Sequence, residues 1–245
     1  MAYQRKFFPR RISQILREHI QTVVTRYRGR IYAWDVVNEA TGENSKPRQT
    51  FWSSALGEDY IRQAFLWAHE ADPEARLFYN DYGGEALGPK SDAIYGLLRN
   101  LKARGVPIDG VGLQSHFQSE RPPNMDNVAT NMKRLAALGL EIHVTEFDVR
   151  MPLPSTAQKL LTQAKIYRDY LSACVSVARC KAFLTWGFTD KYSWIPGRFA
   201  GTGAALPFDE SYQAKPAYGA LLEVLNSARA PFDAPGARRD PESAR

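Results

Sequence analysis

Five short apolar segments alternate with longer amphipathic segments, and this alternation constrains the fold of the chain more than any other feature. The short segments have the length and composition of buried strands, and each gap between them leaves room for one helix and its loops. The predicted strands are residues 31–39, 76–82, 110–116, 141–148 and 181–188. Because strands joined through helices run parallel, the pattern predicts an α/β fold with about five parallel strands.

Six predicted helices surround these strands. Apolar residues recur with the helical period from Ile12 to Tyr27, and Gly29 ends that pattern. Ser155 and Gln158 have the spacing of a capping box at the start of a long helix. Three of the remaining helices end at glycine or proline signals. The helices after the first are predicted over residues 58–71, 90–104, 126–138, 155–178 and 214–225.

Repeated strand–helix units form either a closed (β/α)₈ barrel or an open doubly wound sheet. No glycine-rich phosphate-binding loop follows any predicted strand. Polar or aromatic side chains instead gather at the carboxyl end of every strand, where a barrel builds its active site. They are Asn38, Glu39, Asn80, Asp81, Gln114, His116, Glu146, Asp148 and Trp186. This distribution favours the barrel.

Two of these residues, Glu39 and Glu146, are candidate catalytic carboxyl groups. Either glutamate alone is also compatible with a solvated strand end or an ion pair. In a closed parallel barrel, however, both strand ends face one cavity. Glycoside hydrolysis needs such a pair, because one carboxyl group protonates the leaving oxygen while the other acts as nucleophile or activates water. A separation of about 5–5.5 Å leads to retention and about 6.5–9.5 Å to inversion, and the sequence leaves both open.

Several neighbouring residues have two readings. Asn38 is either a turn former or a hydrogen-bond partner for a sugar hydroxyl group. Strand alternation places Gln114 and His116 on one face, where His116 is either structural or orients the second glutamate. His143 has the opposite parity and is predicted to face the helix layer. The four histidines and two cysteines show no spacing typical of a metal site, and we expect no cofactor.

Tryptophan is mostly a core residue, but Trp186 and Trp194 bound a polar stretch after a strand. Their flat faces suit sugar rings, so we predict that they bind substrate. Trp34, Trp52 and Trp67 lie within strand or helix patterns and are predicted to pack in the core.

Charge and hydropathy argue against nucleic-acid and membrane partners. The net charge of +6 is concentrated in the first thirty residues, and the rest of the chain is close to neutral. No apolar run approaches the roughly 20 residues that span a bilayer. No apolar stretch follows the basic start as it would in a signal peptide. Cys174 and Cys180 lie across a predicted reversal from helix to strand, which is compatible with a disulfide or with two buried thiols.

Several long segments together resemble glycoside hydrolase family 10. They are WDVVNEA (34–40), WAHEADP (67–73), YNDY (79–82), ARGVPIDGVGLQSHF (103–117), VTEFDVR (144–150) and TWGFTDKYSWIPG (185–197). The resemblance covers roughly residues 12–226, which we predict as a catalytic domain between a basic arm, residues 1–11, and a disordered tail, residues 227–245. It implies a (β/α)₈ barrel, acting as a monomer, that hydrolyses internal β-1,4 bonds of xylan or xylo-oligosaccharides with retention.

The resemblance also assigns roles. It makes Glu39 the acid/base and Glu146 the nucleophile, and it implies that Cys174 and Cys180 form a disulfide. It places Trp186 and Trp194 on the glycone side of the cleft. It implies the following further residues: Asn38 for a sugar 2-hydroxyl, Gln114 and His116 for sugar and nucleophile, and Tyr82 for the aglycone side. We add Asn80 as a substrate-binding residue and Asp148 as a supporting one.

The family's first three strands have no counterpart in this chain. The resemblance therefore implies an incomplete barrel, with open edges at the strands that begin near Ile31 and Lys181, poor stability and impaired activity. It also implies secretion of the full-length family members. Two alternatives to a xylanase remain at this point: an inactive carbohydrate-binding remnant, and a related barrel glycosidase that acts on glucan.

Overall fold

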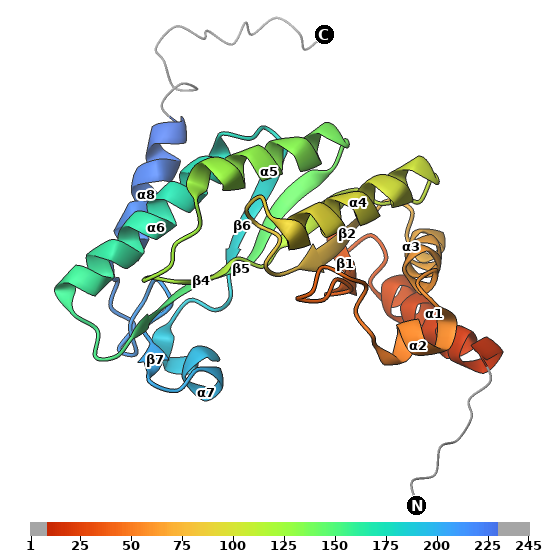
Figure 1. Cartoon of the computed structure of the whole chain (residues 1–245), viewed down its shortest axis with the longest axis horizontal. Coiled ribbons are helices and arrows are strands. Elements are labelled where there is room, and N and C mark those ends of the chain that lie inside the picture. The colour runs from red at the N-terminus through yellow and green to blue at the C-terminus, as the bar shows by residue number, and fades with distance from the viewer. Residues whose placement is uncertain (1–8, 230–245) are drawn as a thin grey trace, which may run out of the picture.

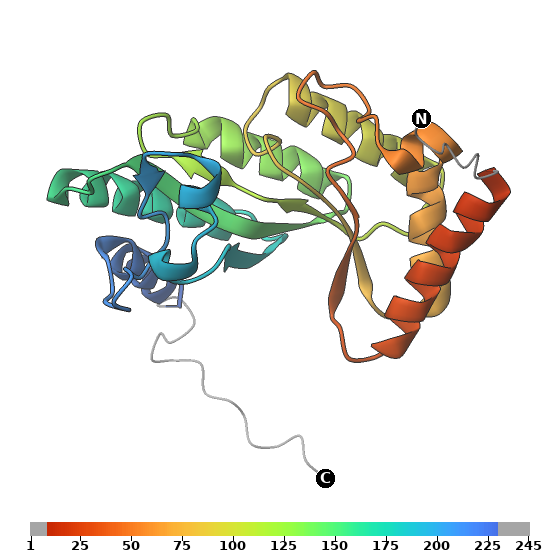
Figure 2. The same cartoon turned by 90° about the horizontal axis from the view of Figure 1, so that it is seen from below.

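The computed structural model describes residues 9–229, which form a twisted parallel sheet with long helices along one face (Figures 1 and 2). Five strands pair in parallel in the order β1-β2-β3-β5-β6. They are β1 (Ala33–Asn38), β2 (Arg76–Asp81), β3 (Gly110–Leu113), β5 (Glu141–Pro152) and β6 (Cys180–Thr185). The predicted α/β fold with five parallel strands is confirmed.

Two short strands extend the far half of β5. β4 (His116–Gln118) pairs with it in parallel, and β7 (Thr202–Gly203) pairs antiparallel with its end. Within residues 9–229, β1 pairs only with β2, and β6 pairs only with β5. The sheet of the described residues is therefore open at both of these strands, as the incomplete barrel predicts.

Six long helices accompany the strands, as predicted, and three short helical segments lie in the loops. The long ones are α1 (Pro9–Arg26), α3 (Tyr60–Ala71), α4 (Pro89–Ala103), α5 (Met125–Ala137), α6 (Ala157–Val175) and α8 (Pro216–Arg229). The short ones are α2 (Phe51–Leu56), η1 (Asp190–Tyr192) and α7 (Ile195–Arg198). In the described part of the chain, no helix combines the length and apolar character that a membrane span requires.

The main core lies between the helices and one face of the sheet. Alternate residues of the strands point into it, and apolar stripes of the helices cover them. Phe147 lies at the centre of an aromatic cluster, with ring centroids 4.6 Å from Tyr167, 5.0 Å from Tyr170 and 4.9 Å from Phe183. Trp34, Trp52 and Trp67 pack against this core, as predicted. The core therefore anchors the strand that carries Glu146.

Three local predictions are corrected by the structure. The helix after residue 155 is capped by Thr156, whose side chain accepts a hydrogen bond from the Lys159 amide, and not by Ser155. The strand predicted over residues 110–116 is interrupted, because Ser115 has a φ of +68°. The first helix begins at Pro9, before Ile12.

The predicted orientation of His143 is wrong. Its ring stacks on Phe78, with 4.0 Å between centroids, whereas the strand neighbour Tyr79 belongs to the helix-side core. His143 therefore lies on the face of the sheet opposite the helices. The pairing of β5 with β6 shifts register between Val144 and Phe147, so alternation cannot be counted across this irregularity.

The two cysteines form a disulfide that joins the end of α6 to the start of β6. The Cα atoms of Cys174 and Cys180 are 5.4 Å apart. This settles the choice that the spacing left open, in favour of the bridge. Of the predicted terminal segments, residues 227–229 belong to α8, and residues 1–8 and 230–245 lie outside the described part.

Candidate active site

A cleft of about 550 Å³ opens at the carboxyl ends of the parallel strands. Both predicted catalytic glutamates line it, together with most of the predicted substrate-binding residues. The lining residues are Glu39, Glu43, Tyr82, Gln114, His116, Glu146, Arg150, Trp186, Trp194, Arg198 and Phe199. Four of them, Glu43, Arg150, Arg198 and Phe199, were not predicted from the sequence as site residues.

Glu39 reaches the cleft because β1 ends just before it. Its φ is +56°, in the left-handed region that non-glycine residues rarely adopt, and its amide donates a 2.8 Å hydrogen bond to the Asn80 carbonyl. Neighbours in a regular strand point to opposite faces. The turn at Glu39 allows its side chain and that of Asn38 to bond the same partner, Gln114.

Three amide side chains connect the two glutamates. Gln114 Nε2 donates to Glu39 Oε1 at 3.0 Å and to Asn38 Oδ1 at 3.2 Å. Asn80 Nδ2 donates to the same Asn38 oxygen at 3.0 Å and to Glu146 Oε1 at 2.9 Å. Strands β1, β2 and β5 thus contribute to one continuous network. The carboxyl groups of residues distant in the sequence are held at the same cleft.

Thr145 is a member of this network that sequence reasoning missed. Its hydroxyl donates a 2.8 Å hydrogen bond to Asn80 Oδ1, which fixes the orientation of the amide and directs Nδ2 toward Glu146. Thr145 directly precedes Glu146 in the sequence, and this adjacency was the only signal that could have identified it as a site residue. Strand alternation argued against it, since neighbours are expected on opposite faces.

His116 and Asp148 hold the other side of the Glu146 carboxylate. His116 Nε2 lies 3.2 Å from Glu146 Oε2, and Nδ1 lies 2.9 Å from Asp148 Oδ2. The Trp194 indole N–H donates to the same Asp148 oxygen at 2.8 Å. Burial lowers the pKa of His116, but the hydrogen bonds to Asp148 and Glu146 outweigh it and raise this pKa to about 9. At neutral pH the imidazolium therefore donates to both carboxylates.

Arg48 contacts the cleft from the loop after β1 and was not predicted. Its guanidinium lies 3.6 Å from Glu39 Oε2 and donates a 2.9 Å hydrogen bond to the Tyr82 hydroxyl group. The ammonium of Lys90 lies 3.4 Å from the centre of the Tyr82 ring and 3.1 Å from Asp81 Oδ1. Tyr82 is thus held from two sides. Arg48 lies in an irregular loop, where no periodic sequence pattern predicts which way a side chain points, so the sequence did not identify it.

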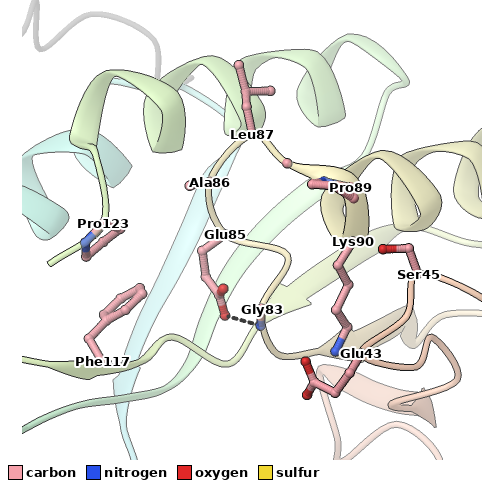
Figure 3. A pocket seen from close by; sticks show the side chains of 11 residues that line it. Glu43, Ser45, Gly83, Glu85, Ala86, Leu87, Pro89, Lys90, Phe117 and Pro123 are labelled. Atoms are coloured by element: carbon pink, nitrogen blue, oxygen red, sulfur yellow. Dashed lines mark hydrogen bonds between the residues drawn. The ribbon is translucent and has the colours of Figure 1, made fainter. Parts of the chain in front are cut away.

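A second hollow, of about 330 Å³, adjoins the cleft, and Glu43 lines both (Figure 3). Glu85 lines it too and accepts hydrogen bonds from the amides of Gly83, at 3.1 Å, and Ser115, at 2.9 Å. Burial raises the pKa of Glu85. These bonds fix the turn after Tyr82 and the left-handed Ser115. Although Ser115 interrupts the regular alternation of side chains along the strand, Gln114 and His116 both line the cleft.

The aromatic residues differ in their surroundings. Trp186 is half exposed and lines the cleft, so its side chain is accessible to a ligand. Trp194 is anchored through its indole N–H to Asp148 and packs edge-on against His116 at 5.0 Å. Across residues 9–229, no three His, Cys, Asp or Glu side chains gather in a way that would hold a metal ion.

Comparison with known proteins supports the resemblance seen in the motifs. The family model of glycosyl hydrolase family 10 matches residues 2–224. Endo-1,4-beta-xylanase B of Thermotoga neapolitana is 45% identical over 212 residues, which are 86% of this chain and 61% of that protein. Endo-1,4-beta-xylanase D of Talaromyces funiculosus is also 45% identical over 212 residues, 86% of this chain and 52% of that protein. The chain thus spans between half and two thirds of the length of these relatives.

Solved structures agree. Native xylanase 10B from Thermotoga maritima superposes with a TM-score of 0.89 at 44% identity, covering 91% of this chain and 69% of that one. Xylanase 10B from Thermotoga petrophila, solved in complex with xylobiose, gives the same TM-score and identity, covering 91% of this chain and 68% of that one. With the family model matching most of its length, the chain belongs to glycosyl hydrolase family 10.

Proposed function

We propose that this chain carries the catalytic pair of a retaining endo-1,4-β-xylanase. The observation that carries the proposal is the continuous hydrogen-bond network that joins Glu39 and Glu146 through Asn38, Asn80 and Gln114 at one cleft. Glycosidic cleavage by this mechanism requires two carboxyl groups at one cleft that can hold a sugar. The xylanases that are 45% identical to this chain over 212 residues support xylan as the substrate class.

The proposed reaction has two displacements. Glu39 protonates the glycosidic oxygen while Glu146 attacks the anomeric carbon, so that the glycosidic bond breaks and a glycosyl ester with Glu146 forms. Glu39, now ionised, then takes a proton from water, whose oxygen attacks the same carbon and releases Glu146. Asn80 and His116 fix the direction of the Glu146 carboxylate in both steps. Glu39 therefore gives up one proton in the first displacement and regains one from water in the second.

Substrate contacts follow from the walls of the cleft. We propose that Trp186 and Trp194 stack on glycone sugars and that Tyr82 stacks on the aglycone side, with Asn38 and Gln114 available to hydroxyl groups. The Thermotoga petrophila structure contains xylobiose, which supports a short xylo-oligosaccharide as ligand. The disulfide between Cys174 and Cys180 favours an oxidising compartment, and hence export.

An aryl β-xylobioside tests the activity, since its hydrolysis releases a coloured phenol. We expect turnover by the unmodified chain, a loss of about 10⁴-fold or more on Glu146→Ala, and rescue of that variant by azide with formation of an α-xylobiosyl azide. Glu120→Ala, at an exposed glutamate outside the cleft, should keep full activity.

The same assay separates the alternatives. Calorimetric binding of xylobiose without turnover would identify a carbohydrate-binding remnant, and faster hydrolysis of a cellobioside would identify a glucanase. Turnover that survives Glu146→Ala would contradict the proposed nucleophile.

A further inference from the structure

One end of the cleft is cationic. Arg150, near the end of β5, and Arg198, at the end of α7, both line the cleft that contains the two catalytic candidates. Their guanidinium carbons lie 3.9 Å and 5.3 Å from the centre of the Phe199 ring. That ring packs edge-on against Trp194, with 5.6 Å between centroids. Two cations therefore adjoin the aromatic wall along which we place a sugar chain.

Among the described residues, neither guanidinium is neutralised by an ion pair. Several arginines within residues 9–229 have a carboxylate within 4.0 Å, but Arg150 and Arg198 are not among them. Asp148 is close enough to raise the pKa of Arg150, but burial acts more strongly and lowers it. Arg150 is thus a partly desolvated cation that a ligand anion would stabilise.

Two of the three glutamates that line the cleft lie on elements other than those that carry the arginines, and the third, Glu146, shares β5 with Arg150. Glu39 and Glu43 lie in and after the turn that follows β1, whereas Arg198 belongs to α7, in the loop after β6. Glu146 is already bonded to Asn80 and His116. An anionic group on a bound sugar chain would be repelled by the glutamates and attracted to the two arginines.

A neutral xylose chain gives these cations no anionic partner. The sugars that carry a carboxylate are uronic acids, and the planar guanidinium group matches a carboxylate with two parallel hydrogen bonds. Resting on the proposed function, we propose that Arg150 and Arg198 form a subsite for a uronic-acid side group, which makes the enzyme selective for acidic xylan. The substituted sugar then lies beside Trp194 and Phe199.

The test compares two ligands that differ only in charge. Dissociation constants for xylotetraose and for xylotetraose with one glucuronic acid side group are measured by calorimetry, in a Glu146→Gln background that prevents turnover. The acidic ligand should bind about tenfold more tightly, since partly exposed charge pairs contribute a few-fold each. Arg198→Gln and Arg150→Gln should each reduce this ratio about threefold, and roughly 0.5 M NaCl should do the same.

Arg99→Gln is the matched control. Arg99 is exposed and lies 5.9 Å from the Tyr95 ring, but outside the cleft, so this variant should keep the ratio of the two dissociation constants. Equal binding of the two ligands, or a ratio that Arg198→Gln leaves unchanged, overturns the subsite and leaves the proposed function intact. Binding of neither ligand overturns both.

Discussion

At the scale of single residues, the electrostatics of the site centre on His116. It lies between Asp148 and Glu146, and Trp194 donates to the Asp148 oxygen that His116 also contacts. The strand pattern left His116 either structural or orienting the second glutamate, and the family resemblance implied the second reading. Neither the pattern nor the resemblance predicted that the histidine would be charged, because the charge depends on two carboxylates brought together by folding.

We therefore predict that His116 titrates near pH 9, where an unperturbed histidine titrates near 6.5. Because the folded-state pKa is raised, its stabilising contribution is complete below about pH 6.5 and is lost as the pH rises through 9. NMR titration of the imidazole resonances measures this pKa directly. A His116 resonance that titrates near pH 6 would contradict the ion-pair arrangement.

At the scale of elements, the loop between β6 and α8 is held by a buried ion pair. Lys215 Nζ donates to Asp190 Oδ2 at 2.8 Å, to the Ala204 carbonyl at 2.7 Å and to the Leu206 carbonyl at 2.6 Å. Both charged side chains are more than nine-tenths buried. Lys215 directly precedes α8, and the same loop carries Trp194. The ion pair therefore links the start of α8 to the loop that forms part of the cleft wall. No sequence pattern indicated it.

Lys215→Met should destabilise the fold by about 3–5 kcal/mol, because it leaves the Asp190 carboxylate buried without its cation. Urea denaturation followed by circular dichroism measures the loss. Lys165→Met removes an exposed partner of Asp169 and should cost at most about 1 kcal/mol. Equal losses in the two variants would show that the buried pair contributes no more than a surface one.

At the scale of the whole molecule, one core supports both the fold and the site. Phe147 is fully buried in the aromatic cluster between β5, β6 and α6, and it is the immediate neighbour of Glu146. Deleting this ring would leave a cavity beneath the carboxylate. The open edges of β1 and β6 in the described residues leave the helix-side core as the main source of stability.

Phe147→Ala should therefore cost about 3–5 kcal/mol, the usual range for a fully buried phenylalanine. Differential scanning calorimetry measures the fall in melting temperature. Phe51→Ala, at a phenylalanine that is 60% exposed, should change it little. A Phe147→Ala variant as stable as Phe51→Ala would contradict the central place of this cluster in the core.

The sequence by itself determined the alternation of strands and helices, their parallel order and the set of polar residues at the strand ends, because these depend on periodicity within short segments. Only the tertiary structure decided which side chains meet. A register shift in β5 between Val144 and Phe147 broke the alternation by which His143 had been assigned to the helix side. A left-handed Ser115 divided a predicted strand, and folding brought Arg48 to Glu39. Such contacts join residues that no local pattern relates, and their geometry depends on backbone irregularities that periodicity does not encode.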